Sequence, residues 1–253
     1  MAMVRSAQVY ADFLLPFLTA QDHLVDVGCG SGELTLELAG FVGRVMGVDI
    51  DEVEIADARR RASRLEVTNA DFHVGDAYSL RLPSDHVDAV FAHSTLEALD
   101  RPQDAVAEMK RVLKPGGMVA VASVEYAGLI LAGPHPELGR RFYEIRERLW
   151  QLDGADPYRG RELRGLLLGA GFVDVVATTK CISYGKPDTV KEFGFGRAED
   201  CTDDWFVTSA EDHGLASTEE LAEMQRAWLD WSDSPTSYAA FAWCRAVGRK
   251  PSP

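Results

Sequence analysis

This chain lacks the sequence features of metal-binding, disulfide-rich, membrane-spanning and repeat proteins. Its 253 residues include only 4 cysteines and no CxxC pair, so the sequence favours neither a zinc site nor a disulfide framework. No apolar run approaches the length of a membrane span, and we find no internal repeat or low-complexity tract. These absences predict a globular protein with reduced thiols, a cytoplasmic location and no bound metal.

Positive charge is also scarce. Lys and Arg number 26 against 40 Asp and Glu, which gives a formal net charge of −14. Such a charge repels nucleic-acid phosphates and anionic membrane surfaces, so we expect neither as a partner. The sequence leaves the oligomeric state open.

Apolar strands and helical patterns alternate from residue 22 onward. The expected strands are 23–28, 44–50, 71–75, 87–92, 118–124, 173–179 and 239–247. Several of them are near-continuous in Val, Ala, Ile and Phe, as strands covered on both faces are. Helices are expected over 51–65, 100–113 and 161–170, with Asp100 as an N-cap. This alternation predicts an α/β fold with a doubly wound, mostly parallel sheet.

Two stretches interrupt the alternation. Residues 126–157 are expected to begin as a Gly/Pro loop and to continue as a helix over 136–151, and residues 185–236 carry helical patterns. We interpret both as cap insertions over the edge of the sheet where ligands bind, within a single domain of residues 1–253. Its other parts are an N-terminal helix at 1–21 and a core of 22–125, 158–184 and 237–250.

The most informative motif lies near the start of the chain. The apolar strand Val25–Val27 enters a turn with glycine at positions 28, 30 and 32, and a helix follows. A second strand ends on Asp49, seventeen residues after the last glycine. A tight glycine turn followed by a carboxylate placed for a ribose is typical of adenosine-containing cofactors.

The details of the turn favour one such cofactor. In the dinucleotide fingerprint GxGxxG the third glycine would stand at Glu33, whereas here it stands at Gly32. Asp26 lies just before the turn, where a carboxylate beside a pyrophosphate is unfavourable. S-adenosylmethionine has no phosphate and carries a sulfonium and an ammonium, so nearby acids favour it. A nicotinamide dehydrogenase is therefore the weaker reading.

Four stretches together carry a family resemblance: Val25–Leu34, Gly47–Asp51, Gly75–Pro83 and Val87–Leu99, with support from Lys114–Gly117. In these stretches the chain resembles the class I S-adenosylmethionine-dependent methyltransferases of the type 11 small-molecule group. The resemblance implies a Rossmann-like sheet of seven strands with the last one antiparallel. It also implies methyl transfer to an O-, N- or C-nucleophile of a small-molecule acceptor. A related protein that binds the cofactor but catalyses a cyclisation stays open.

The resemblance also implies residue roles. It implies cofactor contacts from Tyr10, Asp26, Gly28, Cys29, Gly30, Gly32, Asp49, Ile50, Asp76, Ala77 and His93. Within this set, Asp26 reaches the ammonium, Asp49 takes both ribose hydroxyls and Ile50 packs on the adenine. The Asp76 carboxylate and the Ala77 backbone N–H bind the adenine edge.

Candidates for a base or an acceptor-orienting group are His93, Glu125, Tyr126 and His135. His93 follows the fourth strand, and its ordinary pKa of about 6.5 suits proton transfer; alternatively its ring only packs while its backbone contacts the cofactor. Many relatives carry a second histidine near the position of Ala98, and this chain does not. No Asn/Asp-Pro-Pro-aromatic motif follows the fourth strand, which disfavours a nucleic-acid methyltransferase.

The insertions leave two questions open. Their helix 136–151 carries Arg140, Arg141, Arg146 and Arg148, which could grip an acceptor anion or form a solvated face. In the second reading Phe142, Ile145 and Leu149 pack inward. The tryptophans at 205, 228 and 231 could line an acceptor pocket or fill a core.

Overall fold

The computed structural model describes residues 6–252, and it forms two compact units. The sheet unit comprises residues 6–124, 159–179 and 244–252, and the helical unit comprises residues 125–158 and 180–243. Both predicted insertions fall in the helical unit. Their position over an acceptor site stays a prediction.

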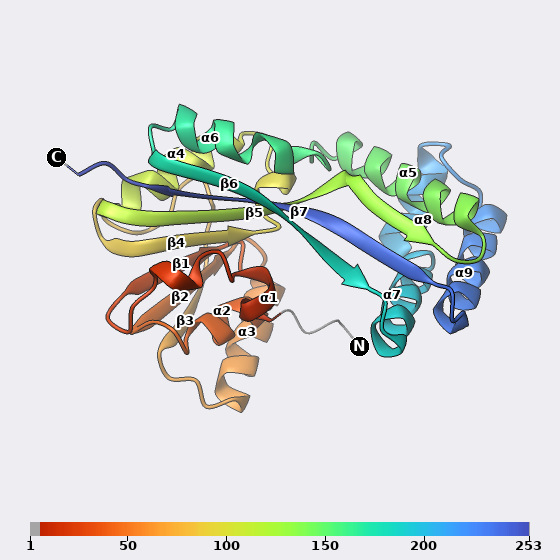
Figure 1. Cartoon of the computed structure of the whole chain (residues 1–253), viewed down its shortest axis with the longest axis horizontal. Helices are drawn as coiled ribbons and strands as arrows, with labels where there is room; N and C mark the ends of the chain where they lie inside the picture. Colours follow the sequence, from red (N-terminus) through yellow and green to blue (C-terminus); the bar gives the residue numbers. More distant parts are fainter. Residues whose placement is uncertain (1–5, 253) are drawn as a thin grey trace. The chain divides into compact units, whose positions relative to one another are not determined.

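The sheet contains all seven expected strands. They are β1 His23–Val27, β2 Arg44–Asp49, β3 Ala70–Val74, β4 Val87–His93, β5 Leu113–Ala132, β6 Val173–Tyr184 and β7 Tyr238–Arg249, in the spatial order β3-β2-β1-β4-β5-β7-β6. The first five pair in parallel. β7 runs antiparallel between β5 and β6 (Figure 1). The order reverses between β1 and β4, where α/β sheets bind ligands at the carboxyl ends of the strands.

Helices cover the sheet through two apolar clusters. α2 (Glu33–Leu38) and α3 (Glu52–Arg64) pack on β3 through Leu36, Ile55 and Phe72. α4 (Pro102–Val112) and α6 (Leu163–Gly169) pack over β4 and β5 through Met109 and Leu167, both fully buried. Near-complete burial explains why β1 and β4 read as continuous apolar runs.

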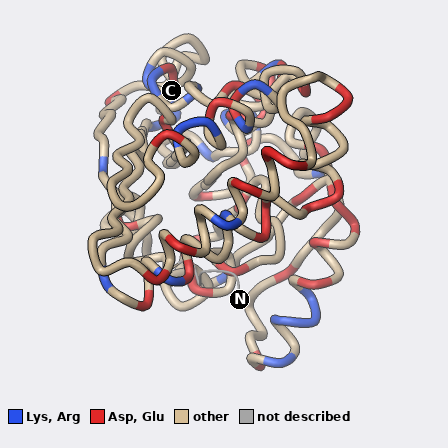
Figure 2. Tube along the Cα trace, turned by 90° about the vertical axis from the view of Figure 1, so that its right-hand side faces the viewer, with Lys and Arg blue, Asp and Glu red and all other residues tan. Residues whose placement is uncertain are grey.

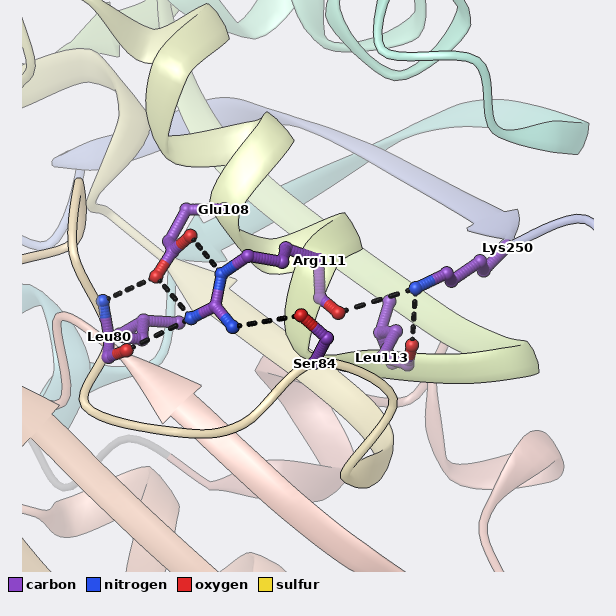
Figure 3. A network of polar contacts seen from close by, with 6 residues as sticks. All are labelled: Leu80, Ser84, Glu108, Arg111, Leu113 and Lys250. Carbon is purple, nitrogen blue, oxygen red and sulfur yellow. Dashed lines mark hydrogen bonds and ion pairs between the residues drawn. The ribbon is translucent and has the colours of Figure 1, made fainter.

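Hydrogen bonds hold the segment that follows β3 against α4. Glu108 accepts from the backbone N–H of Leu80 at 2.7 Å, and Arg111 donates to the Leu80 carbonyl at 3.1 Å (Figure 3). The Glu108–Arg111 pair joins the two contacts, and the Arg111 guanidinium lowers the pKa of the Glu108 carboxyl. Lys250 donates to the Leu113 carbonyl at 2.7 Å at the end of the same network. The network fixes the loop that carries Asp76.

The helical unit has a core of its own. Its helices are α5 Pro136–Leu152, α7 Pro187–Asp200, α8 Asp204–Asp212 and α9 Thr218–Asp233. Trp228 is 2% exposed and packs edge-on against Phe142 and Tyr143. The Trp231 indole donates to the Ala132 carbonyl at 2.8 Å. Aromatic packing therefore holds this unit together.

Three local expectations were wrong. Residues 126–132 continue β5 instead of forming a loop. The first helix is only α1, Ala7–Tyr10, and a separate 3₁₀ turn at Leu15–Phe17 holds Pro16 near its start, where proline is tolerated; residues 1–5 of the predicted N-terminal helix lie outside the described residues. Asp100 is not the N-cap of α4, since its carboxylate accepts from the Tyr78 hydroxyl.

Candidate functional site

The turn between β1 and α2 depends on three glycines in the left-handed region. Gly28, Gly30 and Gly32 have φ angles of 75°, 51° and 77°, which L-residues with a Cβ adopt only with strain. The backbone N–H groups of Gly28 and Cys29 donate to the Val48 carbonyl at 2.7 and 3.1 Å. The turn therefore folds onto the carboxyl end of β2, where Asp49 lies.

The glycines differ in what surrounds them. A Cβ at Gly28 would lie 2.2 Å from Thr95 Oγ1, and one at Gly32 would lie 2.7 Å from the Phe72 ring. At Gly30 a Cβ would meet only Glu54 Oε2, at 3.8 Å. Packing thus requires glycine at 28 and 32, whereas the space beside Gly30 is open to a ligand.

Asp49 is oriented by the turn itself. Its Oδ2 accepts from the Gly30 N–H at 2.8 Å, and its Oδ1 accepts from the Asp51 N–H at 3.0 Å. Each carboxylate oxygen can accept a second hydrogen bond, so both keep capacity for a ligand hydroxyl. The next side chain, Ile50, is 73% exposed. A fixed carboxylate beside an exposed apolar side chain suits a ribose attached to a flat base.

Asp26 lies beneath the turn with little contact to solvent. It is 3% exposed, and its Oδ2 accepts from the Thr35 hydroxyl at 2.6 Å. Burial raises the pKa of this carboxyl to about 7, and the charge of Asp49 adds to the effect while the Thr35 hydroxyl opposes it. Burial also raises the pKa of the neighbouring Cys29 thiol, which makes it a poor nucleophile.

Asp76 and Ala77 lie close to the same end of β2. The preceding Gly75 N–H donates to the Asp49 carbonyl at 2.8 Å. Asp76 Oδ1 accepts from the Tyr78 N–H at 2.8 Å, so this residue does cap a turn. Among residues 6–252, neither Asp76 Oδ2 nor the Ala77 N–H has a hydrogen-bond partner. An acceptor and a donor side by side match the edge of an adenine.

His93 and Tyr10 come together at the end of β4. His93 is 5% exposed, and its ring lies edge-on to the Tyr10 ring with centroids 5.2 Å apart. Ser94, which follows, has a φ of 56°. Such strain at the carboxyl end of a central strand is typical of ligand sites. The packed ring agrees with the reading in which His93 contributes its backbone.

Two residues of this region were not anticipated from the sequence. Thr95 Oγ1 donates to the Val27 carbonyl at 2.9 Å and fills the space above Gly28. Glu97 is 1% exposed and accepts from the Ser123 hydroxyl at 2.6 Å, and burial raises its pKa. The one sequence feature that could have indicated a role for Thr95 and Glu97 is their position just after the fourth strand.

The remaining candidate residues belong to the helical unit. Tyr126 is 8% exposed, and its ring packs against the rings of Trp150 and Tyr143 at centroid distances of 5.4 and 5.9 Å. Glu125 is equally buried. His135 is an exposed residue at the start of α5, with Nε2 3.2 Å from Asp230 Oδ2. Their assignment to acceptor chemistry stays a prediction.

The groups around the turn fit a cationic ligand. Three carboxylates, Asp26, Asp49 and Glu54, act on the Cys29 thiol at its centre and raise its pKa. This donor set opposes a pyrophosphate and favours a sulfonium with an ammonium. Acidic positions are also frequent along the whole trace (Figure 2).

Residues 6–252 contain neither a candidate metal site nor a candidate membrane span. No group of three or more His, Cys, Asp or Glu side chains is placed to hold a metal ion. No helix in this range is long and apolar enough to cross a membrane.

Comparison with known proteins places the chain in a family. Residues 25–121 match the sequence model of the family described as "Methyltransferase domain". The chain is 32% identical over 180 residues to an uncharacterized methyltransferase of Schizosaccharomyces pombe, an alignment that covers 67% of this chain and 63% of the relative. It is 30% identical over 167 residues to the ubiquinone/menaquinone biosynthesis C-methyltransferase UbiE of Azotobacter vinelandii, with 60% and 66% covered. Such alignments span 45% to 66% of the curated relatives.

Solved structures show the same fold. The YcgJ protein of Bacillus subtilis superposes with a TM-score of 0.64 at 18% identity, covering 97% of this chain and all of that one. The cyclase SpnF superposes with a TM-score of 0.58 at 25% identity, covering 98% and 85%. The matched segment holds the glycine turn, Asp49 and Asp76. The chain belongs to the class I S-adenosylmethionine-dependent methyltransferases.

Proposed function

We propose that this protein binds S-adenosylmethionine at the glycine turn and transfers its methyl group to a small-molecule acceptor. The observation that carries the proposal is the cluster of fixed acids around the turn: Asp49 held by the Gly30 N–H, Asp26 buried beneath it and Asp76 beside it. The net charge of −14 favours a small acceptor over a nucleic acid. A cytoplasmic location remains part of the proposal.

Each residue near the turn then has a defined task. Asp49 accepts the ribose hydroxyls, and Ile50 covers one face of the adenine. Asp76 and the Ala77 N–H bind the adenine edge through groups that no described residue engages. The open side of Gly30 lets the backbone approach the ligand closely. Asp26 accepts from the ammonium group at the opposite end.

The cofactor, when bound, supplies a methyl carbon on a positively charged sulfur that leaves as a neutral thioether. The chain's own contribution is alignment and exclusion of water, which together can lower a barrier by about 7–11 kcal/mol. An acceptor with a pKa near about 10 also needs a base. His93, Glu125, Tyr126 and His135 are our candidates, and of these His93 belongs to the same unit as the glycine turn.

A second function is supported by similarity to cyclases. The cyclase SpnF, at 25% identity, shares this fold over 98% of the chain. The residues assigned above account for cofactor binding and do not by themselves require transfer. We therefore retain a cofactor-binding cyclase as the alternative.

The two functions differ in the fate of the methyl group. Incubation with methyl-labelled S-adenosylmethionine and a panel of quinones, phenols and amines should yield a labelled product and S-adenosylhomocysteine. Asp49→Ala is the control, and it should lose both. Tight cofactor binding without labelled product, for the panel and for an extract of the producing cells, would contradict methyl transfer and favour the alternative.

A further inference from the structure

Thr35 has a hydroxyl that the helix around it does not use. The residue is fully buried in α2 (0% exposed). A threonine inside a helix commonly bonds to a carbonyl in the preceding turn. Here Oγ1 donates out of the helix, to Asp26 Oδ2 on β1, at 2.6 Å. A short hydrogen bond from a buried hydroxyl to a carboxylate is a strong contact.

The backbone holds this hydroxyl in a fixed place relative to the glycine turn. Gly32 is the N-cap of α2, and the Leu36 N–H donates to the Gly32 carbonyl at 2.9 Å. Glu33, in the first turn of the helix, pairs with Arg61 of α3 at 2.8 Å. Thr35 therefore cannot shift without moving the turn.

The contact with Thr35 gives the two carboxylate oxygens of Asp26 different hydrogen bonding. Oδ2 is engaged by Thr35, whereas Oδ1 receives no hydrogen bond from any described residue. A carboxylate with one oxygen pinned has a fixed direction for its other oxygen. A hydrogen bond to the charged form also offsets part of the cost of burying it.

We propose that Thr35 is a positioning residue for the amino-acid end of the cofactor: by holding Asp26 Oδ2 it presents Oδ1 to the ligand ammonium. This inference rests on the proposed function, because it requires that the ligand of the glycine turn carries an ammonium group. Thr35 itself makes no contact with the ligand.

The test compares two ligands and two variants. S-adenosylhomocysteine carries the amino-acid end, whereas 5′-methylthioadenosine has the same nucleoside and lacks it. Thr35→Val keeps the shape and removes the hydroxyl, and Thr35→Ser keeps the hydroxyl. By calorimetry, Thr35→Val should bind S-adenosylhomocysteine about tenfold more weakly and 5′-methylthioadenosine less than about twofold more weakly. Thr35→Ser should stay within about twofold of the wild type for both ligands.

The pH dependence supplies a second readout. The charged group that acts on Asp26 is Asp49 on β2, the Cys29 thiol faces it from the turn, and α2 presents only the neutral Thr35 hydroxyl. Because the hydroxyl lowers the pKa of Asp26, its removal should move the rise in S-adenosylhomocysteine affinity to higher pH. The affinity for 5′-methylthioadenosine should not follow this shift.

Each other outcome overturns the inference. An equal loss for both ligands means that Thr35→Val only disturbs the fold of the turn, and an unchanged affinity for S-adenosylhomocysteine means that the hydroxyl has no role. If the wild-type protein binds both ligands equally, Asp26 does not hold the amino-acid end, yet the proposed function stands. If the wild-type protein binds neither ligand, the proposed function fails as well.

Discussion

The sheet unit and the helical unit use their polar and aromatic side chains in different ways. In the sheet unit, backbone geometry holds polar groups at strand ends and leaves some of their capacity free, as at Asp49 and Asp76. In the helical unit, large rings fill the interior, as Trp228 and Phe142 do. A binding site that depends on backbone conformation can be recognised from a short sequence motif. A packed aromatic core has no such motif, so the sequence does not indicate which ligand the helical unit would bind.

Two arginines of α5 form ion pairs with acidic residues of neighbouring helices. Arg141 pairs with Glu220 at 3.1 Å, and Arg146 pairs with Asp200 at 2.9 Å. Phe142, Ile145 and Leu149 form the buried stripe of the helix between these two arginines, at 0%, 0% and 1% exposure. The apolar side chains pack inward as in the second reading of this helix, and Arg141 and Arg146 are in addition paired with acids of neighbouring helices.

The largest effect should come from the core of the helical unit. Trp228→Ala removes a side chain that is 2% exposed and should lower the free energy of unfolding by about 3–5 kcal/mol. Trp205, 46% exposed, is the matched control, and Trp205→Ala should cost less than about 1 kcal/mol. Urea unfolding measures both. A similarly small loss of unfolding free energy in both variants would contradict the contrast between the two units. Trp228 would then face a ligand site and would not be part of the core.

The second-largest effect should come from substitutions in the glycine turn between β1 and α2. Gly28→Ala meets both a φ of 75° and the Thr95 side chain, so it should destabilise the protein by about 2–4 kcal/mol. Gly30→Ala meets a φ of 51° without a clash and should cost about 1–2 kcal/mol. Thermal unfolding without ligand separates the two. Equal losses would show that Thr95 does not confine the turn.

A third effect depends on pH. Burial raises the pKa of Asp26 to about 7 from its ordinary value of 3.8, so the folded state binds a proton that the unfolded state releases between those values. The free energy of unfolding should therefore fall as pH rises from about 4 to about 7. Asp26→Asn should equal the wild-type protein in stability near pH 4 and exceed it increasingly as pH rises to about 7, by at most about 1.4 kcal/mol per pH unit.

Urea unfolding of the ligand-free protein at several pH values measures this difference. Glu97→Gln should change stability with the same sign, since burial raises the pKa of Glu97 as well. A difference that does not vary with pH would mean that Asp26 has the same pKa in the folded and unfolded protein, so that burial does not raise it.

The smallest effect concerns ion pairs. A double-mutant cycle on Arg146 and Asp200, whose side chains are 22% and 27% exposed, should give a coupling of about 1 kcal/mol. The exposed pair Arg44 and Asp71, at 56% and 50%, should give less than about 0.5 kcal/mol. A coupling near zero for Arg146 and Asp200 would indicate that this ion pair does not hold Arg146, which would then be available to bind an acceptor.

The same contrast explains what could be predicted from the sequence. The seven strands and the glycine turn follow from apolar periodicity and from φ angles that only glycine adopts readily, whereas the antiparallel last strand was implied by the family resemblance. The expected loop at 126–132 was wrong because its Gly and Ala residues were read without the strand neighbours that extend β5. Local sequence does not contain that tertiary contact.

The supporting residues of the site could not be predicted for a related reason. Thr35, Thr95 and Glu97 act through partners 9, 68 and 26 positions away in the chain. Asp100 is of a residue type that often forms an N-cap, yet its carboxylate accepts a hydrogen bond from the Tyr78 hydroxyl instead. A short motif reports backbone conformation, whereas these side chains are selected by what the fold brings near them.

The most direct test of the central claim is a calorimetric titration with S-adenosylhomocysteine and with NADH, on the wild-type protein and on Asp49→Ala. We expect saturable binding of S-adenosylhomocysteine, at least about tenfold weaker binding in the variant, and no binding of NADH. Binding of NADH, or an affinity for S-adenosylhomocysteine that Asp49→Ala leaves unchanged, would contradict the assignment of the glycine turn.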